Sequence, residues 1–551
     1  MSMKSAHVGS KRVPGARFKS RAWGARAYAA NYEPLLSEAR DDDRAWVRER
    51  VVYQIFPDRF ARGPEPSVTG IELAPWGSPP TIRGFQGGDL DGVTSKLSYI
   101  EDLGINCIYL CPVFSSGSNH RYHPNSFVEV DPMLGGAEAL KRLVSACHDR
   151  GVRIVLDGVY NHTGRSHHAF ASLLENGAES PYRDWFSRPD GEPFEDEDFP
   201  LRAYPGRGEE PNYACWWDIP DLPRLNYKNA GVKAHVLEAA VGFVERFGAD
   251  GLRLDYPLEI PWQVLSELRS RLGEVGAGAG GAPWIIGEVF GLKPAWCHPI
   301  GPVCGLQNYV SGSLALGLAG EPALEQDEAI GGDYSVSSLS VEQFALSLEE
   351  MICAYKSSMH LQMNVVGTHD TARVLTIANG DRVAVRFAFL ILACIPGVPT
   401  IFQGDELGLQ GGRDPEMRVA MPWGQEASWD GETRSAIKAA FETRRKIEAL
   451  QRGGFRRIRV VGSVGSEELY AFARTISAGP SAVVVLNAGR EEATKVSLTG
   501  VDLVPNTAPG TVFEAALGAD PAATFAVDER GGLGDLSVSA RSALILVQRQ
   551  Q

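Results

Sequence analysis

The chain has 551 residues, of which 44% are hydrophobic and 22% are charged, as in an ordinary globular protein. Its formal net charge is −14, and no basic stripe interleaved with aromatic residues occurs, which excludes nucleic acid and an anionic membrane surface as expected partners. This charge balance favours a neutral small-molecule substrate, and no apolar run reaches the length of a membrane span.

Residues 1–45 are predicted to be a basic, disordered extension. The first 32 residues hold seven Lys and Arg and no acid, and no apolar run of signal-peptide length follows them. A transit peptide of similar composition is the alternative. The eight cysteines show no paired spacing of the zinc-binding kind, which favours buried thiols in a reducing compartment and a cytoplasmic location.

Short apolar runs alternate with longer stretches of helical periodicity between residues 46 and 452. Seven runs are clear, and an eighth, GLQNYV at 305, is weaker. The clear runs are VVYQIFP at 51, INCIYLCPV at 105, VRIVLDGVY at 152, GLRLD at 251, PWIIGEVF at 283, MNVVGTHD at 363 and PTIFQGDE at 399. Strand alternating with helix is typical of a parallel sheet. The pattern predicts an α/β protein, a (β/α)8 TIM barrel.

Two segments depart from this alternation. Residues 163–227 follow the third strand, are rich in Pro, Gly, aromatic and acidic residues, and are too long for a plain connection, which predicts a small inserted domain (domain B) or lid. Residues 453–551 contain alternating runs such as LYAFAR, AVVVLN and ALILVQ between turn residues. They predict a C-terminal all-β sandwich domain.

Polar residues gather at the C-terminal ends of the predicted barrel strands, which form the active face of such a barrel. They are Asp157, Asn161, His162, Asp255, Glu288, His369, Asp370, Asp405 and Glu406. If the strand ends converge, Asp255, Glu288 and Asp370 meet at one mouth. Three carboxylates in one cleft do not share one pKa, because repulsion and burial raise one of them while a guanidinium keeps another ionised.

Such a division of pKa values is what retaining glycoside cleavage requires. One ionised carboxylate attacks the anomeric carbon, and one protonated acid gives a proton to the departing oxygen. Arg253 lies two residues before Asp255 and therefore faces the same side of the strand. We interpret the two as a nucleophile and the cation that tunes it, since a buried ion pair is poor evidence for a purely structural gain.

The order of four motifs, DGVYNH at 157, GLRLD at 251, GE at 287 and HD at 369, resembles the α-amylase family, glycoside hydrolase family 13. The chain is most similar to its neopullulanase, cyclomaltodextrinase and maltogenic amylase group in YQIFPDRFARG at 53, SNHRY at 118, LPRLNY at 222, GTHDTARVLT at 367 and GDELGLQGGRDPEMRVAMPW at 404. The resemblance implies retaining hydrolysis of α-glucosidic bonds in maltooligosaccharides, cyclodextrins or related α-glucans. Transglycosylation or glucosyl isomerisation is the alternative, and a non-catalytic carbohydrate-binding scaffold a more distant one.

The same resemblance assigns roles to residues. Asp255 corresponds to the nucleophile, Glu288 to the general acid/base, and Asp370 to the residue that stabilises the oxocarbenium-like state. The implied substrate-binding residues are Tyr122, which stacks on the sugar, Glu259 on the acceptor side, His162, Arg253, His369 and Arg373. Of Trp216 and Trp217, at most one is expected to face sugar, because adjacent side chains rarely serve one surface.

Three features depart from the family pattern. His123 and Ser126 in YHPNSF stand where relatives often have acids, which implies a changed pocket floor. About 45 residues precede the first strand, where the group usually carries an N-terminal β-domain, so the oligomeric state is left open. The loop ARGPEPSVTG offers only Glu65 as a carboxylate, with Asp89 and Asn161 as further possible ligands, so no cofactor and no required calcium is expected.

Overall fold

The computed structural model describes residues 34–39, 42–64, 70–206, 208–322, 334–461 and 466–550. Within them, eight parallel strands form a closed barrel in chain order, each paired with the next and β8 with β1. The strands are β1 Val52–Ile55, β2 Cys107–Leu110, β3 Arg153–Gly158, β4 Gly251–Leu254, β5 Trp284–Glu288, β6 Gly305–Asn308, β7 Met363–Val365 and β8 Val398–Phe402. The predicted TIM barrel is confirmed, including the weak candidate strand at 305.

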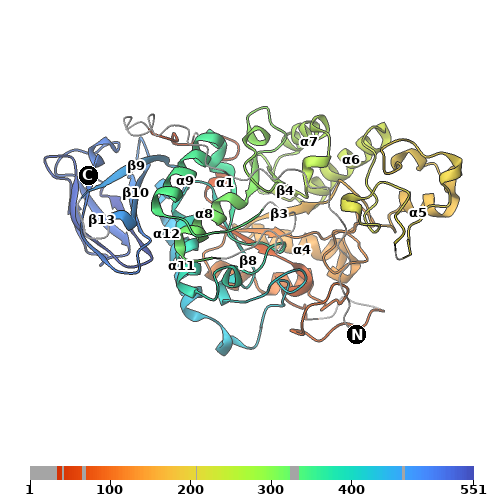
Figure 1. Ribbon diagram of the computed structural model, residues 1–551, viewed down its shortest axis with the longest axis horizontal. Coiled ribbons are helices and arrows are strands. Elements are labelled where there is room, and N and C mark those ends of the chain that lie inside the picture. Colours follow the sequence, from red (N-terminus) through yellow and green to blue (C-terminus); the bar gives the residue numbers. More distant parts are fainter. Residues whose placement is uncertain are drawn as a thin grey trace.

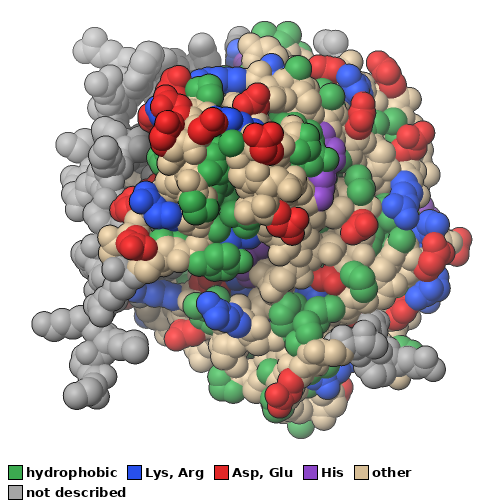
Figure 2. Space-filling model, turned by 90° about the vertical axis from the view of Figure 1, so that its right-hand side faces the viewer, with side chains coloured by type: hydrophobic (Ala, Val, Ile, Leu, Met, Phe, Trp, Pro, Cys, Tyr) green, Lys and Arg blue, Asp and Glu red, His purple; other side chains and the backbone are tan. Residues whose placement is uncertain are grey.

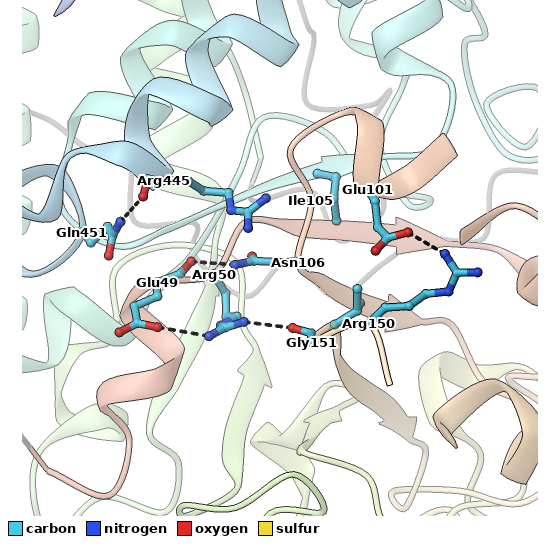
Figure 3. A pocket seen from close by; sticks show the side chains of 10 residues that line it. Glu49, Arg50, Glu101, Ile105, Asn106, Arg150, Gly151, Arg445 and Gln451 are labelled. Carbon is cyan, nitrogen blue, oxygen red and sulfur yellow. Dashed lines mark hydrogen bonds and ion pairs between the residues drawn. The ribbon is translucent and has the colours of Figure 1, made fainter. Parts of the chain in front are cut away.

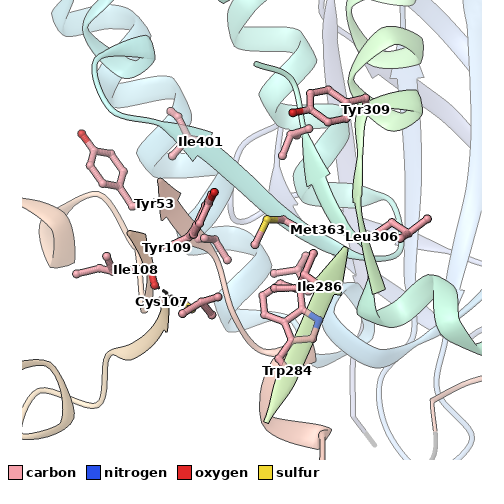
Figure 4. Packing of buried hydrophobic residues seen from close by; sticks show 14 of the residues in the cluster. Tyr53, Cys107, Ile108, Tyr109, Trp284, Ile286, Leu306, Tyr309, Met363 and Ile401 are labelled. Atoms are coloured by element: carbon pink, nitrogen blue, oxygen red, sulfur yellow. Dashed lines mark hydrogen bonds between the residues drawn. The ribbon is translucent and has the colours of Figure 1, made fainter. Parts of the chain in front are cut away.

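The barrel strands are almost wholly buried, as expected of parallel strands that are covered on both faces. Figure 4 shows side chains of β1, β2, β5, β6, β7 and β8 in one apolar cluster, with Tyr109 and Met363 near its centre. Trp284 is also fully buried, and its indole nitrogen donates to the carbonyl of Leu361 at 3.0 Å. This packed interior fixes the strand ends on which the polar residues stand.

Helices cover the outside of the barrel, and one further helix, α5, lies in the insertion at one end of the molecule (Figure 1). In the described residues they are α1 Ala45–Arg48, α2 Leu90–Ser95, α3 Leu97–Asp102, α4 Gly136–His148, α5 His168–Asn176, α6 Ala230–Phe247, α7 Trp262–Val275, α8 Tyr309–Ala319, α9 Val341–Tyr355, α10 Val374–Ile377, α11 Arg382–Cys394, α12 Gly431–Lys446 and α13 Glu448–Arg452. None of these helices combines the length and the apolar character needed to cross a membrane.

Helix α6 leads into the strand that carries Arg253. It begins at Asn229, whose side chain accepts hydrogen bonds from the N–H groups of Gly231 and Val232, and ends at Gly248 with φ 67°. The left-handed glycine turns the chain towards β4, and Asp250 then holds the strand start by accepting the N–H of Ile154 at 2.9 Å. The local sequence therefore sets the register in which Arg253 enters the barrel.

The insertion between β3 and α6 contains α5 and several short 3₁₀ turns, and lies at one end of the molecule (Figure 1). Its last part returns to the strand ends, because His162 forms a bridge with Arg224 and Cys215 forms one with Pro223. On the face of the molecule that includes this end, acidic and basic side chains are interspersed (Figure 2). The insertion thus adds a wall beside the end of β3.

The predicted all-β C-terminal domain is confirmed and lies at the opposite end of the molecule (Figure 1). Its strands form one antiparallel sheet in the order β14-β13-β16-β11-β10-β9-β12-β15. The outermost strands β14 and β15 also contact each other, so the sheet folds over a separate apolar core. The strands are β9 Gly454–Val461, β10 Leu469–Thr475, β11 Ala482–Asn487, β12 Ala493–Thr499, β13 Val512–Leu517, β14 Thr524–Ala526, β15 Leu533–Val538 and β16 Ser542–Gln548.

Part of the predicted N-terminal extension is ordered, which corrects the expectation for residues 34–39. Leu36 is buried and pairs with Phe455 at the start of the C-terminal sheet. The carbonyl of Ser37 lies 3.0 Å from the imidazole of His360 in the barrel domain. Apolar and polar contacts with both domains thus order this segment, whereas residues 1–33 and 40–41 lie outside the described residues.

Candidate active site

Three carboxylates come together where β4, β5 and β7 end. Asp255 directly follows β4, Glu288 is the last residue of β5, and Asp370 lies in the turn after β7. Asp255 and Glu288 are buried, with 7% and 5% of their surfaces exposed, and the side chain of Asp370 is 14% exposed. The strand ends thus form one small polar centre inside an apolar barrel mouth.

The guanidinium of Arg253 lies at the middle of this centre. Its Nη1 is 3.0 Å from Asp255 Oδ1 and its Nη2 is 2.8 Å from Glu288 Oε1. Nε donates to the side-chain oxygen of Gln307 on β6 at 3.2 Å. The side chain is completely buried, so the charge is compensated by carboxylates rather than by water.

Asp157 is a member of this cluster that sequence reasoning did not assign to the site. Its two oxygens lie 3.0 and 3.1 Å from Arg253 Nη1, and one of them also accepts the hydroxyls of Tyr109 and Tyr122 at 2.6 and 2.8 Å. Burial raises its pKa to about 6, against the lowering effect of Arg253. Its place in DGVYNH, one residue before the end of β3, was the available signal.

The nucleophile candidate Asp255 is held by groups on two neighbouring elements. The side-chain amide of Asn161 donates to its carbonyl at 3.0 Å and lies 3.5 Å from its carboxylate. Burial raises the pKa of Asp255, while Arg253 opposes the rise, as do hydrogen bonds from Arg253, Asn161 and Glu288. The donors stabilise the ionised form and fix its direction.

Glu288 has the surroundings of a carboxylic acid that keeps its proton. Burial raises its pKa well above the ordinary glutamate value, Arg253 opposes this, and the negative charges of Asp255 and Asp370 raise it further. Its other oxygen accepts the backbone N–H of Tyr256 at 3.1 Å. Tyr256 has φ 32°, an uncommon left-handed conformation for a bulky residue, and this turn aims the N–H at Glu288.

Asp370 is held by Arg418 and His369. Arg418 Nη2 lies 3.3 Å from one carboxylate oxygen, and His369 Nε2 lies 3.2 Å from the other. The side-chain amide nitrogen of Gln54 lies 2.7 Å from His369 Nδ1, which fixes the orientation of the imidazole beside Asp370. Burial raises the pKa of Asp370 to about 6, although Arg418 and Arg253 oppose the rise.

Two further predicted sugar-binding residues border the centre. The ring of Tyr122 stacks on His369 with centroids 5.2 Å apart and planes 5° apart. His162 Nε2 donates to the carbonyl of Tyr122 at 2.8 Å, and burial lowers the pKa of His162 to about 4, so its imidazole is neutral at pH 7. Both rings are therefore positioned by the same network that holds the carboxylates.

Glu259 and Arg373 lie farther from the three carboxylates. Glu259 ends the short turn after Tyr256, is 28% exposed at its side chain, and lies 3.9 Å from Arg224 of the insertion. Arg373 is completely buried: it pairs with Asp405 at 3.1 Å and donates to the carbonyl of Met417 at 2.7 Å. Its guanidinium also lies over the ring of Phe402, 4.2 Å from the centroid, and sugar binding by Arg373 stays a prediction.

Trp216 and Trp217 were expected to face different ways, but in the structure they face the same way. Their rings stack with centroids 4.7 Å apart and planes 4° apart. The reason is the backbone, because Trp217 has φ 52° and Asp218 has φ 56°, and a left-handed residue breaks the usual alternation of neighbouring side chains. Both indoles therefore lie on one side of the chain.

Two of the three candidate calcium ligands lie in the described residues, where they make other contacts. Asp89 caps α2 by accepting the N–H of Gly92 at 2.7 Å and that of Gly63 at 3.1 Å, and the amide of Asn161 is bound to Asp255. Glu65 lies outside the described residues. Calcium needs six to eight oxygen ligands, and no cluster of three or more metal-binding side chains occurs in the described part of the chain.

Excess chelator is therefore expected to leave activity and melting temperature unchanged. A metal that binds only the native state stabilises it by mass action, so its removal would be visible in a melting curve. The measurement compares melting and activity with and without a calcium chelator. A fall of more than about 4 °C that calcium alone reverses would show ligands outside those described.

A separate pocket of about 460 Å³ lies at the other end of the barrel, before β1, β2 and β3 (Figure 3). Two ion pairs line it, Arg50 with Glu49 at 3.1 Å and Arg150 with Glu101 at 2.8 Å. Arg445 also lines it. Because it opens at the amino-terminal ends of the strands, it is remote from the carboxylates.

Comparisons with known proteins agree with this geometry. A family model described as the α-amylase catalytic domain matches residues 54–267 and 321–451. A cyclomaltodextrinase of Geobacillus thermopakistaniensis is 35% identical over 420 residues, which cover 74% of this chain and 64% of that protein. The match thus spans less than two thirds of this relative's own length.

Two solved structures are similar over most of the chain. The debranching enzyme of Nostoc punctiforme has a TM-score of 0.75 and 35% identity, covering 93% of this chain and 99% of its own. The cyclic α-maltosyl-(1→6)-maltose hydrolase of Arthrobacter globiformis has a TM-score of 0.74 and 31% identity, covering 93% and 100%. Both likenesses therefore extend beyond the barrel into the C-terminal domain.

Proposed function

Because the chain belongs to the α-amylase family, we propose that it is a retaining glycosidase that hydrolyses α-glucosidic bonds. The proposed substrates are maltooligosaccharides, cyclodextrins or related α-glucans, as the names of its relatives suggest. The observation that carries the proposal is the contact of one buried guanidinium, Arg253, with both Asp255 and Glu288. Cytoplasmic location is proposed because six of the eight cysteines are buried thiols, which is typical of a reducing compartment.

In the proposed mechanism Asp255 attacks the anomeric carbon and forms a glycosyl ester. Glu288 gives its proton to the departing glycosidic oxygen, so the leaving sugar departs as a neutral alcohol. The resulting Glu288 carboxylate then takes a proton from water, which attacks the ester and releases Asp255. Asp370, held by Arg418, would stabilise the positive charge that develops on the sugar ring.

The released sugar is expected to keep the α configuration. Asp255 and Glu288 lie close enough that the two terminal nitrogens of Arg253 contact one carboxylate each, at 3.0 and 2.8 Å. This proximity supports the separation of about 5 to 5.5 Å that retaining enzymes use, which leaves no room for a water between carboxyl group and sugar. Proton resonance of freshly cleaved maltotriose, recorded before mutarotation, measures the configuration. An initial β product would contradict the mechanism.

The substrate class can be tested by product chromatography on maltotriose, pullulan, β-cyclodextrin, isomaltose, trehalose and sucrose. Cleavage of at least one of the first three is expected, because their α-glucosidic bonds are those named for the relatives. If none of the six substrates is cleaved, the proposed function is contradicted. Products longer than the substrate would instead indicate the transferase alternative.

A further inference from the structure

A stacked pair of tryptophans lies next to the residue that follows the nucleophile. Trp217 is 42% exposed, which is unusual for a ring that could bury its large apolar surface. We propose that Trp216 and Trp217 form a binding site for the glucosyl unit on the leaving-group side of the cleaved bond. The proposal rests on the glycosidase function above and adds a saccharide site to it.

The local backbone is arranged to present these rings. Trp217 and Asp218 are consecutive non-glycine residues with φ 52° and 56°, a conformation that L side chains rarely adopt. The result is an indole supported from behind by a parallel indole 4.7 Å away. Such a rigid, flat apolar surface suits the C–H face of a pyranose ring, and it loses little conformational freedom on binding.

Tyr256 connects the pair to the reacting centre. Its ring lies nearly perpendicular to both indoles, at 5.7 Å from Trp216 and 6.0 Å from Trp217. Its backbone N–H donates to Glu288, the proposed acid, at 3.1 Å. Because the acid protonates the departing oxygen, the leaving sugar lies on the side of Glu288. The indole pair therefore lies beside the proposed acid through Tyr256, and Trp216 also lies 5.5 Å from the ring of His162 at the reacting centre.

Polar groups accompany the aromatic surface, as sugar recognition requires. Arg224 and Glu259 lie 3.9 Å apart, with side chains 39% and 28% exposed, on the insertion and on the turn after Tyr256. Both come from the segments that carry Trp217 and Tyr256, so their charged ends can reach hydroxyl groups at the ring edge. Apolar face and polar rim together fit a neutral hexose.

The experiment compares Trp217→Ala with Trp262→Ala, a matched tryptophan that is 38% exposed on α7. Two donors are used: maltotriose, which has a leaving sugar, and α-glucosyl fluoride, which has none. We expect Trp217→Ala to lower kcat/KM for maltotriose relative to that for the fluoride about fivefold to tenfold, the size of one lost stacking contact. Trp217→Phe should recover most of this ratio, and Trp262→Ala should leave it within about twofold.

Transfer gives a second readout. With the fluoride as donor and added maltose as acceptor, Trp217→Ala should reduce the ratio of transfer product to glucose by a similar factor. Equal losses on both donors, or equal behaviour of the two alanine variants, would overturn the inference while leaving the glycosidase function standing. A change in oligomeric state on sedimentation of Trp217→Ala would also overturn it. A wild type that cleaves neither donor would contradict the function itself.

Discussion

Asp255→Asn is expected to lower turnover of α-glucans to below about one hundredth of the wild-type rate, because an amide cannot form the glycosyl ester. The substitution nearly preserves volume, and the amide can still contact Arg253 and Asn161, which lie near the carboxylate. The fold should therefore persist. Initial rates on maltotriose, together with a melting curve, measure both parts of the prediction.

Asp196→Asn in the insertion is the matched control, since its side chain is 79% exposed and pairs with Arg183. It should behave as the wild type. Mass spectrometry excludes deamidation of the introduced asparagine back to aspartate. Residual activity above about one hundredth in a sample free of deamidation would count against covalent catalysis at this residue.

Azide offers a positive test of the same role. Asp255→Gly opens space where the carboxylate stood, so azide can attack the anomeric carbon from that face. With α-glucosyl fluoride as donor, the fluoride leaves and a glucosyl azide of β configuration forms. An α azide, or no reaction in a folded variant, would place the nucleophile elsewhere.

Glu288→Gln is expected to reduce cleavage of maltotriose strongly, by about 10²- to 10⁴-fold if proton transfer is its main contribution. The leaving sugar of maltotriose needs protonation, whereas the phenolate of an activated aryl glucoside needs little. The aryl substrate should therefore lose less in the step that forms the intermediate. Pre-steady-state rates with both substrates measure this step, and equal losses would reassign the acid.

The pH profile of the wild type should reflect the same groups. Activity should fall as pH rises through the raised pKa of Glu288, because the acid then loses its proton. It should also fall at acidic pH as Asp370, with a pKa raised to about 6, and Asp255 become protonated. Glu288→Gln should lose the alkaline limb with the aryl substrate. A persistent alkaline limb there would indicate another acid.

The barrel could be predicted because its strands are short apolar runs bounded by polar residues, a pattern set by burial on both faces. Strand β6, Gly305–Asn308, gave the weakest signal because Gln307 and Asn308 are polar. The structure explains them: Gln307 accepts from Arg253, and Asn308 donates to Asn364 on β7. A strand whose polar side chains are paired with neighbouring strands is therefore hard to recognise from hydrophobicity alone.

The carboxylates at the strand ends could be predicted from the sequence. The role of a residue was harder to predict where it depends on contacts with residues distant in the sequence. Asp157 was noticed as a polar strand end, but its pairing with Arg253 depends on the register Asp157↔Arg253 between β3 and β4. The pairing of Arg373 with the buried Asp405 could not be predicted, because the two residues lie 32 positions apart in the sequence. The stacking of Trp217 on Trp216 follows from positive φ angles at two non-glycine residues. Such angles cannot be predicted from the residue types.

The arrangement around Arg253 also determines which molecules other than substrate the cleft attracts. The guanidiniums of Arg253 and Arg418 together contact five carboxylates: Asp157, Asp255 and Glu288 at Arg253, and Asp370 and Asp414 at Arg418. Acidic groups therefore outnumber cations in this centre, even with Glu288 protonated as the proposed acid. Small protonated amines and nitrogen-containing sugar mimics would be drawn into it as counter-ions, so amine buffers act as competitors and rates are best compared in buffers that lack them.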